Sequence, residues 1–103
     1  MTFDEYSHLA NSTRHYTRSR REALEYVNTG FGGEAGEYLD EYKKHLRDVG
    51  EYYHPPLGER RIALLLELGD TLWYLSRIAM ELDSSLHEVA QMNVDKLRTR
   101  YIK

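Results

Sequence analysis

The sequence predicts an all-α fold, an antiparallel helical bundle of about four helices. Its two prolines are adjacent, and the long proline-free stretches are rich in Glu, Leu, Ala and Arg, which favour helix. Apolar residues recur with helical spacing, and no segment alternates apolar and polar residues as a half-buried strand does. A chain of 103 residues has room for one hydrophobic core, so we expect a single helical domain over residues 1–103.

Composition excludes several classes of function. The absence of cysteine excludes disulfides and thiolate metal sites. A formal net charge of −3 is too small to indicate binding to a nucleic-acid polymer. The first residues do not have the pattern of a signal peptide, and the longest apolar run, residues 62–66, is too short to span a bilayer. We therefore expect a cytoplasmic protein that does not bind membranes.

The first helix is predicted to begin after Thr2, because Thr2 and Glu5 have the spacing of a capping box, and to end near residues 11–14. A basic segment, residues 15–21, follows. This segment is either a solvated linker or a basic lip beside an anionic substrate, and the sequence leaves both interpretations open. The arginines concerned are Arg14, Arg18, Arg20 and Arg21.

A long second helix is predicted over residues 22–48, although this stretch contains four glycines. Each glycine costs roughly 1 kcal/mol relative to alanine in a helix interior. Small residues would allow another helix or a ligand to approach the backbone closely. A break at residues 28–30 is the alternative, and we favour one helix. The glycines are Gly30, Gly32, Gly33 and Gly36.

Residues 49–58 form a clear loop that contains both prolines. Glu51-x-x-His54 within it has the spacing of a di-iron helix motif, but it occurs once and next to the prolines, so we interpret it as part of the loop. A third helix is predicted over residues 59–82. Its apolar seam is expected to face the bundle core: Leu65, Leu68, Leu72, Leu75, Ala79 and Leu82.

The last helix is predicted over residues 86–101, after a turn at residues 83–84 and a second capping box at residues 85–88. We expect it to pack against the other helices. The residues it would bury are Leu86, Val89, Ala90 and Leu97, with Val94 or Tyr101 as a further candidate.

Two pairs of carboxylates dominate the candidate chemistry: Glu34 with Glu37, and Glu67 with Asp70. A spacing of three residues puts both members of a pair on one helix face. Two such helices side by side would direct four carboxylates into one volume, which requires neutralising cations. An all-oxygen site suits Mg²⁺, with Mn²⁺ as an alternative. Glu41 continues the first stripe and is at most an additional ligand.

Glu67 stands in the most apolar part of the chain, between residues 62–66 and Leu68. An unpartnered carboxylate there would cost several kcal/mol. A salt bridge is the alternative to metal ligation, and we favour metal ligation because a matching pair exists on the other helix. The possible salt-bridge partners are Arg60, Arg61 and Arg77.

Three further residues could bind a substrate. Asn93 is expected on the buried seam of the last helix, and Lys96 follows one turn later; an amide beside an ammonium suits phosphate oxygens, although a buried core amide is the usual alternative. Tyr74 lies one turn after Asp70 and could donate a hydrogen bond to a phosphate or a base, or it is simply a bundle tyrosine. Trp73 is expected on another face, in the core or at a subunit interface.

No histidine pair has metal-ligand spacing, and no serine or threonine has the setting of a nucleophile. A carboxylate-bound metal acting on a phosphate ester or anhydride therefore matches the residues best.

In combination these motifs resemble the MazG-like all-α nucleoside triphosphate pyrophosphohydrolases. The resemblance covers about residues 23–101 and consists of Glu-x-x-Glu, Glu-x-x-Asp-Thr-Leu-Trp-Tyr and Asn-x-x-Lys. It implies Mg²⁺-dependent conversion of a (d)NTP to the (d)NMP and pyrophosphate. It also implies roles for residues: Glu34, Glu37, Glu67 and Asp70 as metal ligands, Glu34 or Glu37 as the general base, and Asn93, Lys96 and Tyr74 as substrate contacts.

One departure concerns position 33, where the fuller family motif has glutamate and this chain has Gly33. Two other functions remain open: a dUTP- or dCTP-selective diphosphatase of the same superfamily, and a non-catalytic helical interaction module. A homodimer or homotetramer is expected, because so small a bundle would leave apolar residues for another subunit to cover, and the family resemblance implies the same.

Overall fold

The computed structural model describes residues 1–16 and 19–101. This part of the chain forms four helices and no strand, so the all-α prediction is confirmed. The helices are α1 (Phe3–Ser12), α2 (Arg20–Val49), α3 (Gly58–Glu81) and α4 (Leu86–Tyr101), and their ends lie within a turn of the predicted positions. Among the described residues, no helix is both long enough and apolar enough to cross a membrane.

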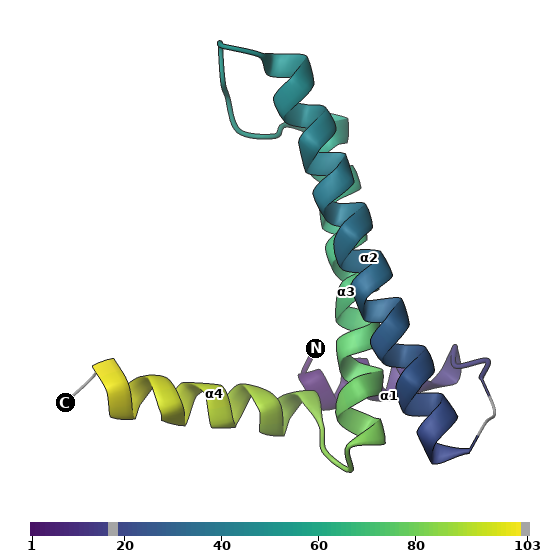
Figure 1. Ribbon diagram of the computed structural model, residues 1–103. Helices are drawn as coiled ribbons and strands as arrows, with labels where there is room; N and C mark the ends of the chain where they lie inside the picture. Colours follow the sequence, from purple (N-terminus) through teal and green to yellow (C-terminus); the bar gives the residue numbers. More distant parts are fainter. Residues whose placement is uncertain (17–18, 102–103) are drawn as a thin grey trace.

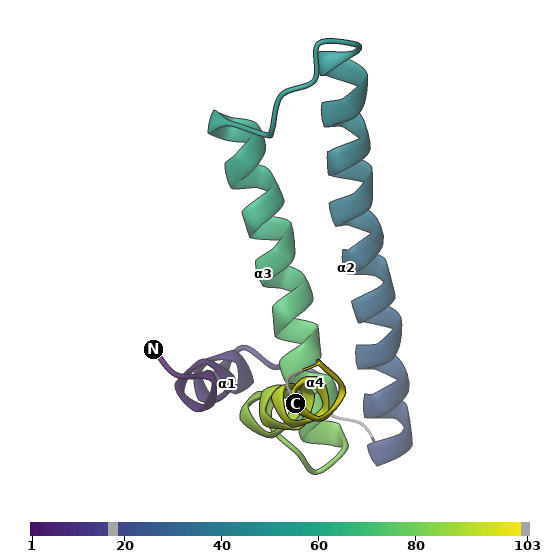
Figure 2. The same cartoon turned by 90° about the vertical axis from the view of Figure 1, so that its left-hand side faces the viewer.

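Helices α2 and α3 lie side by side and antiparallel, and they form a long hairpin (Figures 1 and 2). The far end of the hairpin is held together by His45, which is buried and whose Nε2 donates to the carbonyl of His54 at 2.8 Å. Arg60 of α3 bonds Glu41 and Asp48 of α2 at 2.9 and 2.8 Å. The loop between α2 and α3 therefore packs on α2, and Glu51-x-x-His54 lies outside any helix, as expected.

Helix α1 packs across the other end of the hairpin through a buried cation. Its capping box is present, since the Glu5 amide donates to the Thr2 hydroxyl and the Thr2 amide donates to the Glu5 carboxylate. Arg77 of α3 is fully buried and donates to the Ser7 carbonyl at 2.7 Å and to Asn11 Oδ1 at 2.8 Å. Because a buried charge needs such hydrogen bonds, Arg77 fixes α1 on α3.

The described arginines of the predicted basic segment make contacts within the chain, and two of them, Arg20 and Arg21, are the first residues of α2. Arg14 lies over the Tyr16 ring, 5.5 Å from its centroid. Arg20 pairs with Asp83, and Arg21 pairs with Glu25 at 3.0 Å. Arg18 lies outside the described residues. These contacts favour a linker over a basic lip.

Helix α2 runs without a break through its glycines, as predicted. Gly30 has a clear reason, because a Cβ at this position would overlap the ring of Tyr74 on α3. The close approach of the two helices at this point thus depends on Gly30. Added Cβ atoms at the other three glycines of α2 would meet open space within the described chain.

The predicted seam of α3 is confirmed only in part: Ala79 is buried and Leu72 is half-buried. Leu65, Leu68, Leu75 and Leu82 are exposed, while Glu67, Tyr74 and Ile78 face α2 or the core beside it. The apolar residues of α3 lie on more than one face of the helix. The leucine stripe is therefore left without a partner in the described chain.

Helix α4 also differs from the expected packing. It projects away from the hairpin to one side (Figure 1). Leu86 is buried and Ala90 is half-buried, but Val89 and Leu97 are 49% and 41% exposed, so their predicted burial was wrong. The radius of gyration is 16.6 Å, against about 13 Å for a compact chain of this length.

Replacing Gly30 by alanine should destabilise the protein by about 1–2 kcal/mol, because displacing the Tyr74 ring costs more than the helix propensity gained. Gly32→Ala on the same helix meets no neighbour and should stabilise by up to about 1 kcal/mol. Denaturant unfolding of both variants checks this. Equal effects would show that Tyr74 does not pack against position 30.

Candidate metal centre

Three carboxylates converge between the middle sections of α2 and α3. Glu34 of α2 and Glu67 and Asp70 of α3 each offer one oxygen, and these oxygens lie within 4.8 Å of one another. The spacing of three residues puts Glu67 and Asp70 on the same side of α3, and the antiparallel hairpin brings that side opposite Glu34. The predicted convergence of the two motifs is thus found for these three residues.

Glu37 is the fourth predicted ligand. Glu37 does not belong to the group of three, but its negative charge, after burial, raises the pKa of both Glu34 and Glu67. Glu37 therefore lies near both carboxylates and is more exposed than either.

No cationic side chain of the described residues forms an ion pair with the three clustered carboxylates. Burial, followed by the charges of Glu37 and Asp70, raises the pKa of both Glu34 and Glu67. The Oε2 atoms of both glutamates are buried and have no hydrogen-bond partner in the described chain. Three carboxylates facing each other in this way require a cation or bound protons.

The salt-bridge alternative for Glu67 is not found among the described residues. Arg60 pairs with Glu41 and Asp48, and Arg77 is bound to α1. No ion pair with Glu67 is present in that part of the chain. The carboxylate of Glu41 is held by Arg60, so Glu41 is not free to act as an additional ligand.

These residues fit a divalent cation with oxygen ligands. Because Mg–O bonds are about 2.1 Å long, two ligands of one Mg²⁺ lie at most about 4.2 Å apart. The three oxygens lie within 4.8 Å of one another, so small side-chain movements would bring them around one ion. Mg²⁺ retains several waters when few protein carboxylates bind it, which suits the exposed position of Asp70. The buried, unpartnered oxygens of Glu34 and Glu67 would thereby gain a partner.

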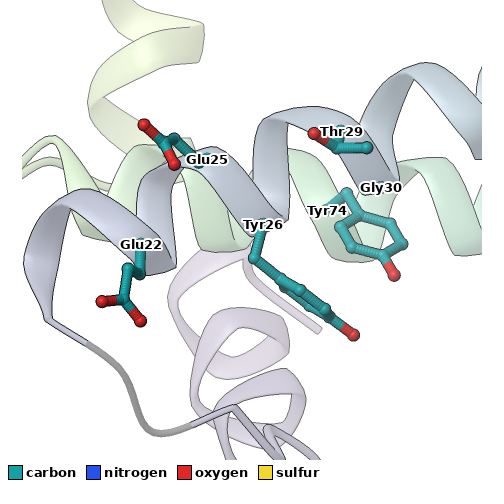
Figure 3. A pocket seen from close by; sticks show the side chains of 6 residues that line it. All are labelled: Glu22, Glu25, Tyr26, Thr29, Gly30 and Tyr74. Atoms are coloured by element: carbon teal, nitrogen blue, oxygen red, sulfur yellow. The ribbon is translucent and has the colours of Figure 1, made fainter.

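Tyr74 lines two pockets, one of which contains two residues of the cluster. One, of about 410 Å³, lies on α2 and is lined by Glu22, Glu25, Tyr26, Thr29, Gly30 and Tyr74. In Figure 3 the hydroxyls of Tyr26 and Tyr74 point to the same side of this pocket. The other, of about 310 Å³, contains the cluster residues Glu34 and Asp70 together with Thr13, His15, Trp73 and Tyr74. The structure thus brings Tyr74 to the carboxylates.

The Tyr74 hydroxyl remains a hydrogen-bond donor near neutral pH. Burial, with the adjacent Tyr26 and Glu34, raises the pKa of Tyr74.

Sequence reasoning missed two residues of the second pocket. Trp73 was expected on another face, in the core or at a subunit interface, and it does pack against the core cluster. It also lines this pocket, because it lies three residues after Asp70 and this spacing places the two on one side of a helix. His15 comes from the segment between α1 and α2, where no periodic pattern fixes a direction. Both belong to the wall that faces Glu34 and Asp70.

Asn93 and Lys96 are not brought to the carboxylates of their own chain. Both are exposed on α4, and the expected burial of Asn93 was wrong. Lys96 lines a separate surface pocket with Asp95, Thr99 and Arg100. Their contact with a substrate stays a prediction.

Comparisons with known proteins identify related sequences. The family model described as the MazG nucleotide pyrophosphohydrolase domain matches residues 23–103. The "Gene 37 protein" of Mycobacterium phage L5 is 43% identical over 79 residues, which cover 77% of this chain and 67% of that protein. No solved structure matches the chain.

Without metal, stability should fall as pH rises above about 4.5, the ordinary pKa of glutamate. Since folding raises the pKa of Glu34 and Glu67, the folded state binds protons more tightly. The stabilisation from these protons is complete below the unfolded pKa and is lost as pH rises through the folded pKa.

Glu67→Gln should make this decline shallower and raise the melting temperature of the chelator-treated protein at neutral pH. Thermal unfolding across pH checks both effects, with Glu51→Gln in the exposed loop as the matched control. Parallel curves for the wild type and Glu67→Gln would contradict the repulsion described here.

Proposed function

Because the chain belongs to the MazG nucleotide pyrophosphohydrolase domain family, we propose that it is a Mg²⁺-dependent enzyme that converts a (d)NTP to the (d)NMP and pyrophosphate. The observation that carries the proposal is the carboxylate cluster. Glu34, Glu67 and Asp70 approach within 4.8 Å and have no compensating cation among the described residues. Such an arrangement costs stability, which a metal-binding role explains.

In this proposal Glu34, Glu37, Glu67 and Asp70 bind Mg²⁺. Bound there, Mg²⁺ neutralises phosphate oxygens and lowers the pKa of a water molecule. Glu34 or Glu37 accepts the proton of the attacking water. Tyr74 donates a hydrogen bond to the substrate.

In this proposal Asn93 and Lys96 contact the substrate that is bound at the carboxylates of a second subunit. Their own α4 points away from the hairpin (Figure 1), so an amide and an ammonium from α4 would reach the carboxylates of another copy. The exposed leucines of α3 and the exposed apolar residues of α4 provide surfaces for that copy to cover. A homodimer or homotetramer would then complete the site.

A substrate panel tests the activity. Incubation with each (d)NTP and Mg²⁺, followed by separation of the products, should show monophosphate and pyrophosphate. Glu34→Gln should lower kcat/KM at least about a hundredfold, because it removes a metal ligand and one of the two candidate proton acceptors, whereas Glu51→Gln should not. Turnover confined to dUTP or dCTP would indicate the selective diphosphatase. If no nucleotide yields both products, the chain is not this enzyme, and a helical interaction module becomes the better account.

Assembly is a separate prediction. Light scattering at micromolar concentration should show a dimer or a tetramer. Leu97→Glu should shift the population toward monomer, since it puts a charge into an apolar face, whereas His87→Glu at the exposed start of α4 should not. A monomeric wild-type protein would remove the second subunit from the proposed site.

A further inference from the structure

The pocket that contains Glu34 and Asp70 has an aromatic wall. The rings of His15 and Trp73 are stacked, with centroids 6.5 Å apart and an angle of 23° between their planes. Trp73 comes from α3 and His15 from the segment that follows α1, so the wall joins two parts of the chain. The pocket therefore combines carboxylates that suit a metal-bound phosphate with flat apolar faces.

Thr13 holds both rings in place. Trp73 Nε1 donates to the Thr13 hydroxyl at 2.9 Å, and that hydroxyl donates to the Ala10 carbonyl at 2.8 Å. His15 Nδ1 lies 3.0 Å from the Thr13 carbonyl, and since a carbonyl only accepts, Nδ1 carries a proton. Both rings are thus oriented by one residue at the end of α1, before any ligand is present, which lowers the entropy cost of binding.

The other aromatic residues nearby are less suitable for a flat ligand. Tyr26 and Tyr74 are tilted by 46°, so they do not present parallel faces. Trp73 and Tyr74 meet edge to face at 82°, and Tyr74 thereby supports the Trp73 ring from the side. The pocket between Tyr26 and Tyr74 is lined by Glu22 and Glu25 and contains none of the three clustered carboxylates.

We infer that His15 and Trp73 form the base-binding subsite of the nucleotide whose phosphates lie at the carboxylate cluster, an inference that rests on the proposed function. A planar heterocycle stacks on these faces, and every nucleobase offers such a face. The pocket volume of about 310 Å³ is at the lower end of the range for small-molecule sites, about 300–1,000 Å³. The subsite holds the base and leaves the hydrolytic step to the carboxylates.

Trp73 is the one tryptophan of the chain, so its fluorescence reports on this subsite directly. A deoxynucleoside monophosphate should quench the fluorescence in a saturable manner. Inorganic tripolyphosphate with Mg²⁺ should bind without this quenching, because it has no base. Quenching of the same size by tripolyphosphate, or nucleotide binding by calorimetry without quenching, would overturn the inference.

His15→Ala should weaken nucleotide binding about tenfold, in line with the loss of one stacking face, and should leave tripolyphosphate binding unchanged. His87→Ala, at another exposed histidine, is the matched control and should change neither. His15 is exposed, so the variant should fold, and circular dichroism checks this. Unchanged nucleotide affinity in folded His15→Ala would overturn the inference.

The two proposals fail in different ways. Saturable quenching by nucleotides without hydrolysis of any (d)NTP would support the subsite and end the enzymatic proposal. Hydrolysis with equal KM values for the wild type and His15→Ala would support the enzyme and overturn the subsite.

Discussion

Packing α3 against α2 forces carboxylates of like charge together, and the rest of the structure is arranged around this repulsion. Glu34, Glu67 and Asp70 meet in the middle of the hairpin, while the attractive contacts lie toward its two ends. At one end Tyr74 packs on Gly30, and at the other Arg60 bridges Glu41 and Asp48. Contacts at both ends of the hairpin therefore hold the two helices together, although the carboxylates at its centre repel one another. This arrangement fits a site that binds an external cation.

Local signals in the sequence predicted the helices and the carboxylates well. The capping box at Thr2, the loop with both prolines and the spacing of three residues in each acidic pair are all short-range features, so they do not depend on how helices pack. The choice of packing face is not local. Helix α3 has apolar residues on two sides, and only its contact with α2 shows that Glu67 and Tyr74 face inward while Leu68 faces outward.

The same limit applies to α4 and to the aromatic wall. The apolar residues of α4 indicated burial, but their spacing does not say whether the partner is the same chain or another copy. His15 lies in a non-helical segment, and Thr13 brings it to Trp73 through contacts that no spacing rule predicts. Residue type and spacing therefore predict the carboxylates of the cluster. The residues that surround the cluster depend on the tertiary fold, which spacing does not predict.

The most direct test of the central claim is a Mg²⁺ titration of the purified, chelator-treated protein followed by thermal unfolding. A cation bound only by the folded state should raise the melting temperature saturably, by an amount equivalent to about 2.7 kcal/mol at a hundredfold excess over Kd. The account predicts this shift for the wild type and its loss in Asp70→Asn. An unchanged melting temperature of the wild type in Mg²⁺ and in Mn²⁺ would contradict a metal site between α2 and α3.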